Sequence, residues 1–267
     1  MTALVFYLAA LGAILSGSMI FPALVAFGFQ EFGIGYRMLM YGASGGFLCT
    51  AILLSILGRV GGLSRNSAVV LALTCWTFFP ILMAFPVSDI AQISFIDALF
   101  QTVSSFTTSG SYVFANGDAQ PRSLVYLLSQ FQWMGGFATL VTLILVLAPW
   151  EIGGLPQVAS ASVAASIVAS QKRLVAFCSS LFRFYLVLTL TCFFLLVFVG
   201  ISPFNSMLFS FSALSTGAVL QGEQTFDILL GQGGMLIVAI FLLVGATSVF
   251  WQMDIFQLKF SRLRRHR

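Results

Sequence analysis

Two short segments rich in serine, threonine and glycine are the parts of this sequence whose residue types could bind an ion. They end the stretches Ile93–Ser111 (ISFIDALFQTVSSFTTSGS) and Ile201–Ala218 (ISPFNSMLFSFSALSTGA), both of which begin with Ile-Ser. Gly110 and Gly217 would let the backbone adopt a positive φ or pack closely, so that successive carbonyl oxygens turn toward one axis. Carbonyl oxygens arranged in this way can replace the hydration shell of a cation. The pattern predicts two cation-binding loops formed by the main chain.

A short helix is expected before each of these loops. Ser94–Phe106 and Ser202–Ala213 are too short to cross a bilayer, and the leading Ser, followed in the second by Pro203, is typical of a helix start. A helix carries about half a negative charge at its C-terminus, which here would point at the loop. We therefore predict half-helices that enter the membrane and return. The residues predicted to form the filter are Thr107, Thr108, Ser109, Gly110, Ser111, Leu214, Ser215, Thr216, Gly217 and Ala218. Ion contact is predicted for Thr108, Ser109, Gly110, Ser215, Thr216 and Gly217.

The composition places these loops in a membrane protein. Hydrophobic residues make up 59% of the 267 residues and charged residues 7%, whereas a soluble domain has about 25% charged residues. A bilayer core about 30 Å thick needs roughly 20 apolar residues in a spanning helix. The sequence predicts an all-α integral membrane protein with roughly six spans. These are Ala3–Phe29, Met38–Leu57, Ala68–Val87, Leu124–Trp150, Phe177–Ile201 and Met235–Gln252.

The third and fifth predicted spans have similar sequences. VLALTCWTFF (Val70–Phe79) and VLTLTCFFLL (Val187–Leu196) match at Val, Leu, Leu, Thr and Cys in register. Each is followed by a short segment, a loop and another span, so one unit occurs twice in the same orientation. We predict an N-terminal helix pair over 1–62, a first helix/pore-loop/helix repeat over 63–158, and a second over 159–267 with a basic tail. Irregular backbone at membrane depth is tolerated only inside protein or beside a water-filled path, so the two loops predict a cavity that they line.

The basic residues predict the orientation of the spans. They gather at Arg59 and Arg65, at Lys172 and Arg173, and in the tail from Lys259 to Arg267. Because basic loops stay inside, we expect a multi-pass protein of the cell (inner or plasma) membrane with both termini cytoplasmic. The opposite side then carries more acidic than basic residues, which predicts a weakly cation-attracting mouth. The tail is interpreted as an anchor beside membrane lipid, and no nucleic-acid partner is expected.

The same residues also fit other kinds of protein. Ser, Thr and Gly also suit polar turns between ordinary transmembrane helices, and a secondary transporter with broken helices is the nearest alternative within transport. An enzyme is disfavoured, because the single His266 lies in the basic tail and the sequence has no HExxH motif. No cofactor is predicted. Tryptophans that are candidates for interfacial anchors are Trp76, Trp133, Trp150 and Trp251.

At the two loops the chain resembles the Trk/Ktr/HKT superfamily of potassium transporters. DALFQTVSSFTTSGS (Asp97–Ser111) is similar to the family's first pore helix and filter, and SQFQWMGGFATLVTLILVLAP (Ser129–Pro149) to the helix after it. Ser202–Val219, with LSTGAV, resembles the second filter, and LLVGATSVFWQ (Leu242–Gln252) resembles the end of the second repeat. The resemblance covers nearly everything from Leu63 onward.

The resemblance implies a half-length pore subunit for potassium uptake. Family members carry four repeats around one pore and this chain has two, so a second copy of the chain or a separate chain would supply the others; the residues leave both open. Family filters use Gly for potassium, and a Ser in the first filter is associated with sodium. Gly110 and Gly217 therefore imply K+ as the transported ion. A sodium-conducting homologue and a non-conducting assembly or regulatory subunit are the alternatives. The family also implies a cytoplasmic nucleotide-binding regulatory partner.

Overall fold

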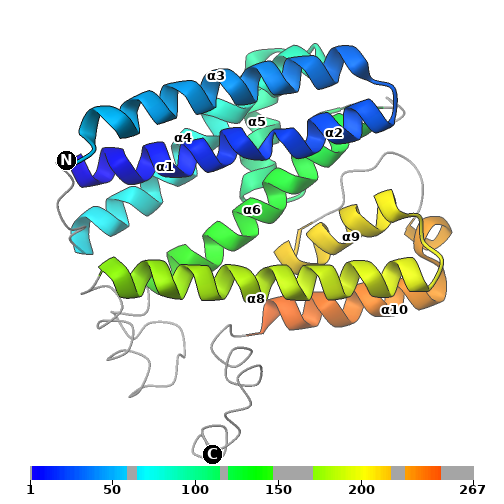
Figure 1. Cartoon of the computed structure of the whole chain (residues 1–267). Helices are drawn as coiled ribbons and strands as arrows, with labels where there is room; N and C mark the ends of the chain where they lie inside the picture. The colour runs from blue at the N-terminus through cyan, green and yellow to red at the C-terminus, as the bar shows by residue number, and fades with distance from the viewer. Residues whose placement is uncertain (1, 59–64, 115–119, 147–170, 218–225, 248–267) are drawn as a thin grey trace, which may run out of the picture. The chain divides into compact units, whose positions relative to one another are not determined.

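The fold is a set of helices arranged in two compact units. The structure, a computed structural model, describes residues 2–58, 65–114, 120–146, 171–217 and 226–247. One unit contains the described residues up to Gln132 and the other those from Trp133 onward. The helices are α1 (Thr2–Ser18), α2 (Ile20–Gly28), α3 (Phe32–Ile56), α4 (Arg65–Ala91), α5 (Phe95–Phe106), α6 (Arg122–Val146), α8 (Gln171–Phe198), α9 (Pro203–Ser215) and α10 (Phe226–Ala246), as Figure 1 shows.

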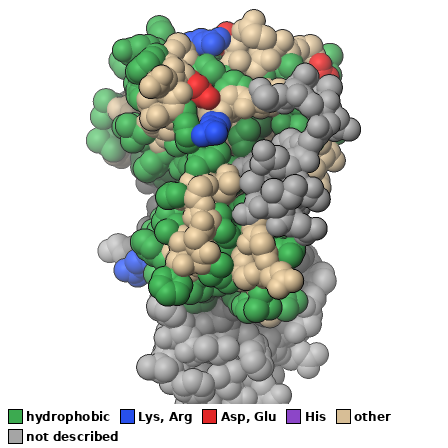
Figure 2. Space-filling model, turned by 90° about the vertical axis from the view of Figure 1, so that its right-hand side faces the viewer, with side chains coloured by type: hydrophobic (Ala, Val, Ile, Leu, Met, Phe, Trp, Pro, Cys, Tyr) green, Lys and Arg blue, Asp and Glu red, His purple; other side chains and the backbone are tan. Residues whose placement is uncertain are grey.

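The helices confirm the prediction of an all-α, multi-pass membrane protein. Large apolar side chains such as Met40 (71% exposed), Phe47 (75%) and Leu243 (70%) point outward. Apolar side chains are also widespread on the described part of the face drawn in Figure 2, interspersed with other side chains and backbone. Lipid would cover such a surface. Within the described residues, the segments long and apolar enough to span a membrane are Thr2–Gly28, Phe32–Ile56, Val69–Ala91 and Cys178–Phe198.

The two other predicted spans correspond to α6 and α10. α6 is 25 residues long and carries Gln130 and Gln132 near its middle. The apolar part of α10, Leu230–Ala246, is a shorter helix than the four spanning segments. Predictions that fall on Arg59, Trp150, Trp251 and the basic tail Lys259–Arg267 lie outside the described residues.

The N-terminal helix pair packs closely because glycines face its contact. Figure 1 shows α1 and α2 running alongside α3. A Cβ atom on Gly42 would lie 2.8 Å from the carbonyl oxygen of Ser16, and one on Gly12 would lie 2.8 Å from Sγ of Cys49. At Gly42 the close atom belongs to the backbone, so a larger side chain would force the helices apart, whereas at Gly12 the Cys49 side chain would have to shift. Small residues of this kind allow membrane helices to approach each other.

A proline explains both the break between α1 and α2 and the presence of a buried glutamine. Pro22 has no N–H group, so it cannot donate to the carbonyl oxygen of Ser18 four residues earlier. The side chain of Gln130 on α6 replaces that donor: its Nε2 donates to the Ser18 carbonyl oxygen over 3.1 Å. Gln130 is 6% exposed. The polar residue in α6 therefore holds the N-terminal pair against α6.

In the second unit, α9 is the short element. It contacts both α8 and α10, and α8 and α10 also contact each other. α10 has a kink at Gly231, whose φ of 59° and ψ of 179° are not helical. The short helix α9 is thus held by the two longer helices α8 and α10.

Candidate functional site

The first candidate ion-binding loop follows the short helix α5. The N-cap residue Ser94 accepts a hydrogen bond from the backbone N–H of Asp97 (3.2 Å), and its hydroxyl donates to Asp97 Oδ2 (2.7 Å). The helix has 12 residues, so it is about 18 Å long and shorter than a bilayer core of about 30 Å. Thr102 Oγ1 donates to the carbonyl oxygen of Pro80 in α4 (2.9 Å). These contacts fix the start and the middle of a helix that the sequence predicts over Ser94–Phe106.

Aromatic packing fixes the end of α5. Phe106, its last residue, is 2% exposed. Its ring stacks on Phe131 of α6 with centroids 4.8 Å apart, and it meets Trp76 of α4 edge-on at 5.1 Å. Because Phe106 directly precedes the loop, these rings hold the point at which the loop begins.

The chain leaves α5 through a left-handed residue. Thr108 has a φ of 57°, and the backbone N–H of Ser109 donates to the carbonyl oxygen of Ser104 over 3.0 Å. A hydrogen bond that reaches back five residues past an αL residue is the Schellman helix end. Gly110 follows with a φ of 77°, a conformation that favours glycine. The backbone reverses direction within these residues.

Buried polar side chains of α5 then hold the returning strand of the loop. Ser104 Oγ donates to the carbonyl oxygen of Ser111 (2.7 Å) and lies 3.1 Å from Ser109 Oγ. Gln101 Oε1, on a fully buried side chain, accepts from the backbone N–H of Val113 over 3.0 Å. Residues 109–113 therefore run back beside α5.

Some polar groups of the first loop are not used by this support. Thr107, Ser109 and Ser111 are exposed, whereas Gln101 and Ser104 beneath them are buried. Within the described residues, the carbonyl oxygens of Thr108, Ser109 and Gly110 accept no hydrogen bond. A turn of this shape can present successive carbonyl oxygens to a cation.

The second loop follows α9 and begins in the same way. Ser202 is the N-cap and accepts from the backbone N–H of Asn205 (3.4 Å), with Pro203 in the first turn. Thr216 has a φ of 53°, and the backbone N–H of Gly217 donates to the carbonyl oxygen of Ser212 over 3.1 Å. The hydroxyl of Ser212 also donates to the carbonyl oxygen of Gly217. Ala218, predicted to belong to this loop, lies outside the described residues.

Comparison with known families identifies the group of proteins to which this fold belongs. The family model for TrkH, described as "Cation transport protein", matches residues 69–218, which is more than half of the chain. The chain belongs to the TrkH family of cation transport proteins. The match includes both short helices and both loops up to Ala218.

Individual TrkH-family proteins match the chain over about half of their length. The "Trk system potassium uptake protein TrkH" of Vibrio parahaemolyticus is 25% identical over 249 residues, which are 88% of this chain and 49% of that protein. The protein of the same name from Escherichia coli K12 is 25% identical over 250 residues, 87% of this chain and 49% of that protein. The crystal structure of the potassium transporter TrkH from Vibrio parahaemolyticus has a TM-score of 0.78 at 23% identity, over 96% of this chain and 52% of that chain. It has the same fold.

The helix ends show which residues of the two TrkH-family loops are equivalent. The αL residue is Thr108 in the first loop and Thr216 in the second, and the residue after it bonds back to Ser104 or Ser212. Gly217 therefore corresponds to Ser109. The residue that corresponds to Gly110 by count is Ala218. The sequence places Gly110 and Gly217 at like positions in TTSG and LSTG, whereas at the helix ends Gly217 takes the place of Ser109.

Two of the predicted filter residues belong to the helix. α9 continues to Ser215 instead of ending at Ala213. Leu214 and Ser215 are 5% and 4% exposed, and Ser215 Oγ donates to the carbonyl oxygen of Phe211 (2.8 Å). The helix extends further because Ser215 satisfies its hydroxyl within the last turn, which local polarity alone does not reveal.

Three acidic residues on the predicted mouth, Glu31, Asp89 and Asp97, have structural partners. The carboxylate of Glu31 accepts from the backbone N–H groups of Arg122 (2.8 Å) and Ser123 (3.1 Å), at the N-terminus of α6, where a negative charge is favourable. Asp89 pairs with Arg37 at 3.5 Å, and Asp97 is bound by Ser94 as described above. The charges of Glu31 and Asp89 are offset locally, so these two carboxylates attract cations less than the acidic count implies.

The residues that support the loops were not identified from the sequence. Gln101, Ser104 and Ser212 look like ordinary polar residues on apolar helices. A signal was present nonetheless, because Ser104 and Ser212 each precede their αL threonine by four residues. Trp133, a candidate interfacial anchor, instead donates from Nε1 to Thr189 Oγ1 (3.0 Å) inside the second unit.

Proposed function

We propose that this TrkH-family chain takes part in potassium uptake across a membrane, with two loops that each contribute to a selectivity filter. The observation that carries the proposal is the turn after α5, which leaves the carbonyl oxygens of Thr108, Ser109 and Gly110 without hydrogen bonds in the described residues. The relatives named as potassium uptake proteins support it. The proposed filter residues are 107–111 and 214–218.

The mechanism rests on main-chain oxygens that are held in place before an ion arrives. A K+ ion that enters exchanges water for carbonyl oxygens, and their fixed positions reduce the reorganisation that this exchange requires. The C-terminal ends of α5 and α9 add about half a negative charge each to the loops that follow them. Ser104 and Gln101 keep the first loop in shape without occupying the carbonyl oxygens of residues 108–110. The ion is the transported species and no cofactor is needed.

The two loops need further pore loops around the same ion path. A filter surrounds the ion, and backbone polar groups cannot face lipid without partners. In this proposal the remaining loops come from a second copy of the chain or from a separate chain. In this proposal the chain itself consists of the helix pair 1–62 and the two helix/pore-loop/helix repeats 63–158 and 159–267. A cytoplasmic nucleotide-binding subunit would regulate the pore, and both termini would lie on that side of the membrane.

Growth at low potassium tests the proposal. The chain is produced in cells that lack potassium uptake, and Rb+ and Na+ uptake are measured. Because a side chain at the positive φ of Gly110 costs roughly 1–2 kcal/mol, Gly110→Ser should reduce Rb+ uptake about 5- to 30-fold and raise the relative Na+ uptake. Gly33→Ser is the matched control, since a Cβ on Gly33 meets nothing within 4 Å.

The outcomes separate the alternatives. Rescue that Gly110→Ser does not alter would refute the filter assignment, and Na+ uptake without Rb+ uptake would indicate the sodium-conducting homologue. Co-purification of two differently tagged copies of the chain supports a second copy as the missing half. Absence of rescue until a separate chain is added supports the heteromeric form, and rescue in neither case supports the non-conducting subunit.

A further inference from the structure

The last turn of α9 is enclosed by two glycines from different helices of the second unit. A Cβ atom on Gly136 of α6 would lie 2.7 Å from Ser215 Cβ, 2.9 Å from Ser215 Cα and 2.9 Å from the hydroxyl of Tyr185. A Cβ on Gly245 of α10 would lie 3.2 Å from the carbonyl oxygens of Ala213 and Leu214 and from Thr216 Cγ2. These positions meet the backbone at the end of α9, just before the second loop.

α6 cannot easily move away from α9, because it is bound to α8 next to Gly136. Trp133 Nε1 donates to Thr189 Oγ1 (3.0 Å), and the hydroxyl of Tyr185 donates to the carbonyl oxygen of Trp133 (3.2 Å). The Trp133 ring also stacks on Tyr185 and packs against Phe211 of α9, with centroids 5.2 and 5.4 Å apart. A side chain at position 136 would therefore displace α9 rather than α6.

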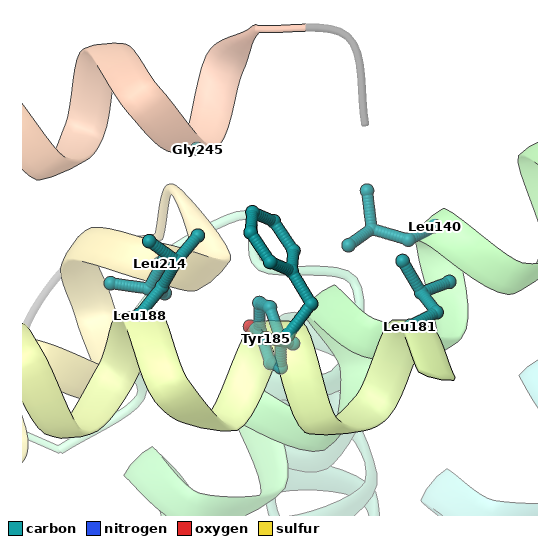
Figure 3. A pocket seen from close by; sticks show the side chains of 7 residues that line it. Leu140, Leu181, Tyr185, Leu188, Leu214 and Gly245 are labelled. Atoms are coloured by element: carbon teal, nitrogen blue, oxygen red, sulfur yellow. The ribbon is translucent and has the colours of Figure 1, made fainter. Parts of the chain in front are cut away.

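The side of α9 that faces Gly245 has slightly more freedom. Figure 3 shows Leu214 and Gly245 on the wall of a small apolar cavity, with Tyr185 and Leu188 of α8 nearby. Its volume of about 10 Å³ is room for about one water molecule at most. The end of α9 therefore borders a small empty space on this side. Contacts at Gly245 are longer than those at Gly136, so the two positions should differ in how strongly they resist a methyl group.

We propose that Gly136 and Gly245 are positioning residues that set where the second loop leaves α9. This inference rests on the proposed role of that loop in the filter. A methyl group at position 136 must displace Ser215 by roughly 0.7 Å or more to reach ordinary contact distance, and Thr216 and Gly217 follow directly. The main-chain oxygens of the loop move with them, which changes ion preference without removing any ion-binding atom.

The test compares alanine substitutions at glycines with different surroundings. Gly136→Ala should lower the ratio of Rb+ to Na+ uptake about tenfold, equivalent to about 1.4 kcal/mol, at equal amounts of protein in the membrane. Gly245→Ala should lower it less. Gly33→Ala is the control and should leave the ratio unchanged. Gly136→Ala combined with Ser215→Gly, which removes the 2.7 Å contact, should restore part of the ratio.

Failure of this inference differs from failure of the proposed function. If Gly110→Ser changes the ion ratio and Gly136→Ala does not, the loops form a filter but the glycines do not position it. If neither substitution changes the ratio, the filter assignment itself is wrong.

A readout that needs no transport covers variants that conduct poorly. Thr216 is exposed, so a Thr216→Cys variant should react with a water-soluble thiol reagent. Adding Gly136→Ala should alter the rate of this reaction at least severalfold. Equal rates in the two backgrounds would overturn the proposal.

Discussion

Thr108 provides the sharpest test of the loop geometry, because a β-branched residue rarely adopts a positive φ. Its φ of 57° carries a strain of roughly 1–2 kcal/mol relative to glycine. Thr108→Gly removes this strain. It also stabilises the unfolded chain by about 0.5–1 kcal/mol, because glycine has more conformational freedom there. We expect a net gain of about 0.5–1 kcal/mol in stability, a rise of about 1–4 °C in the unfolding temperature. Rb+ uptake should fall, because strain of this kind is kept at functional sites.

The neighbouring residue is the matched control. Thr107 has a φ of −80°, and its hydroxyl donates to the carbonyl oxygen of Val103 (2.8 Å). Thr107→Gly relieves no strain and loses a hydrogen bond worth about 0.5–1.5 kcal/mol, so it should lower the unfolding temperature. Thermal unfolding of both variants in the same detergent measures the difference in sign. A Thr108→Gly protein destabilised as much as Thr107→Gly would show that Thr108 is not strained, and the described turn would be wrong.

Three further predictions address the supports of the loop and of the helices. Ser104→Ala removes the donor to the Ser111 carbonyl oxygen and should lower the ratio of Rb+ to Na+ uptake about 2- to 10-fold. The control Ser44→Ala changes an exposed serine that bonds within its own helix, and it should leave the ratio unchanged. Glu31→Gln removes a negative charge from the N-terminus of α6 and should cost about 0.3–1 kcal/mol, measured as a lower unfolding temperature; an unchanged value would argue against the Glu31 contact. Pro22→Ala gives the Ser18 carbonyl oxygen a backbone donor, so that its hydrogen bond from Gln130 Nε2 is no longer the replacement for a missing one. A double-mutant cycle of Pro22→Ala and Gln130→Leu should therefore show a coupling of about 0.5–3 kcal/mol, and additive effects would refute the pairing.

The sequence predicted the elements that depend on local signals. The short helices begin at Ser94 and Ser202 as expected, because Ser accepts from the backbone N–H three residues later in both. The long apolar segments were equally clear, since hydropathy over about 20 residues is a strong signal. The filter residues themselves remain a prediction that the ion-uptake experiments address.

Contacts between distant residues could not be predicted in the same way. Ser18 lacks a backbone donor because of Pro22, and the side chain that replaces this donor, Gln130, lies 112 positions after Ser18 in the sequence. Glu31 caps a helix that begins 91 residues later. A single sequence places both residues on their elements but does not show which elements meet.

The hydrogen bonds at the two helix ends align the two loops differently from their sequences. TTSG and LSTG both end in glycine, which suggests that Gly110 and Gly217 play the same part. The αL threonines and the bonds back to Ser104 and Ser212 instead pair Gly217 with Ser109. If the second loop continued as the first does, position 218 would need a positive φ, which costs roughly 1–2 kcal/mol for alanine. Ala218→Gly should therefore raise the Rb+ to Na+ uptake ratio if the loops act alike, and an unchanged ratio would mean that the second loop follows a different course after Gly217.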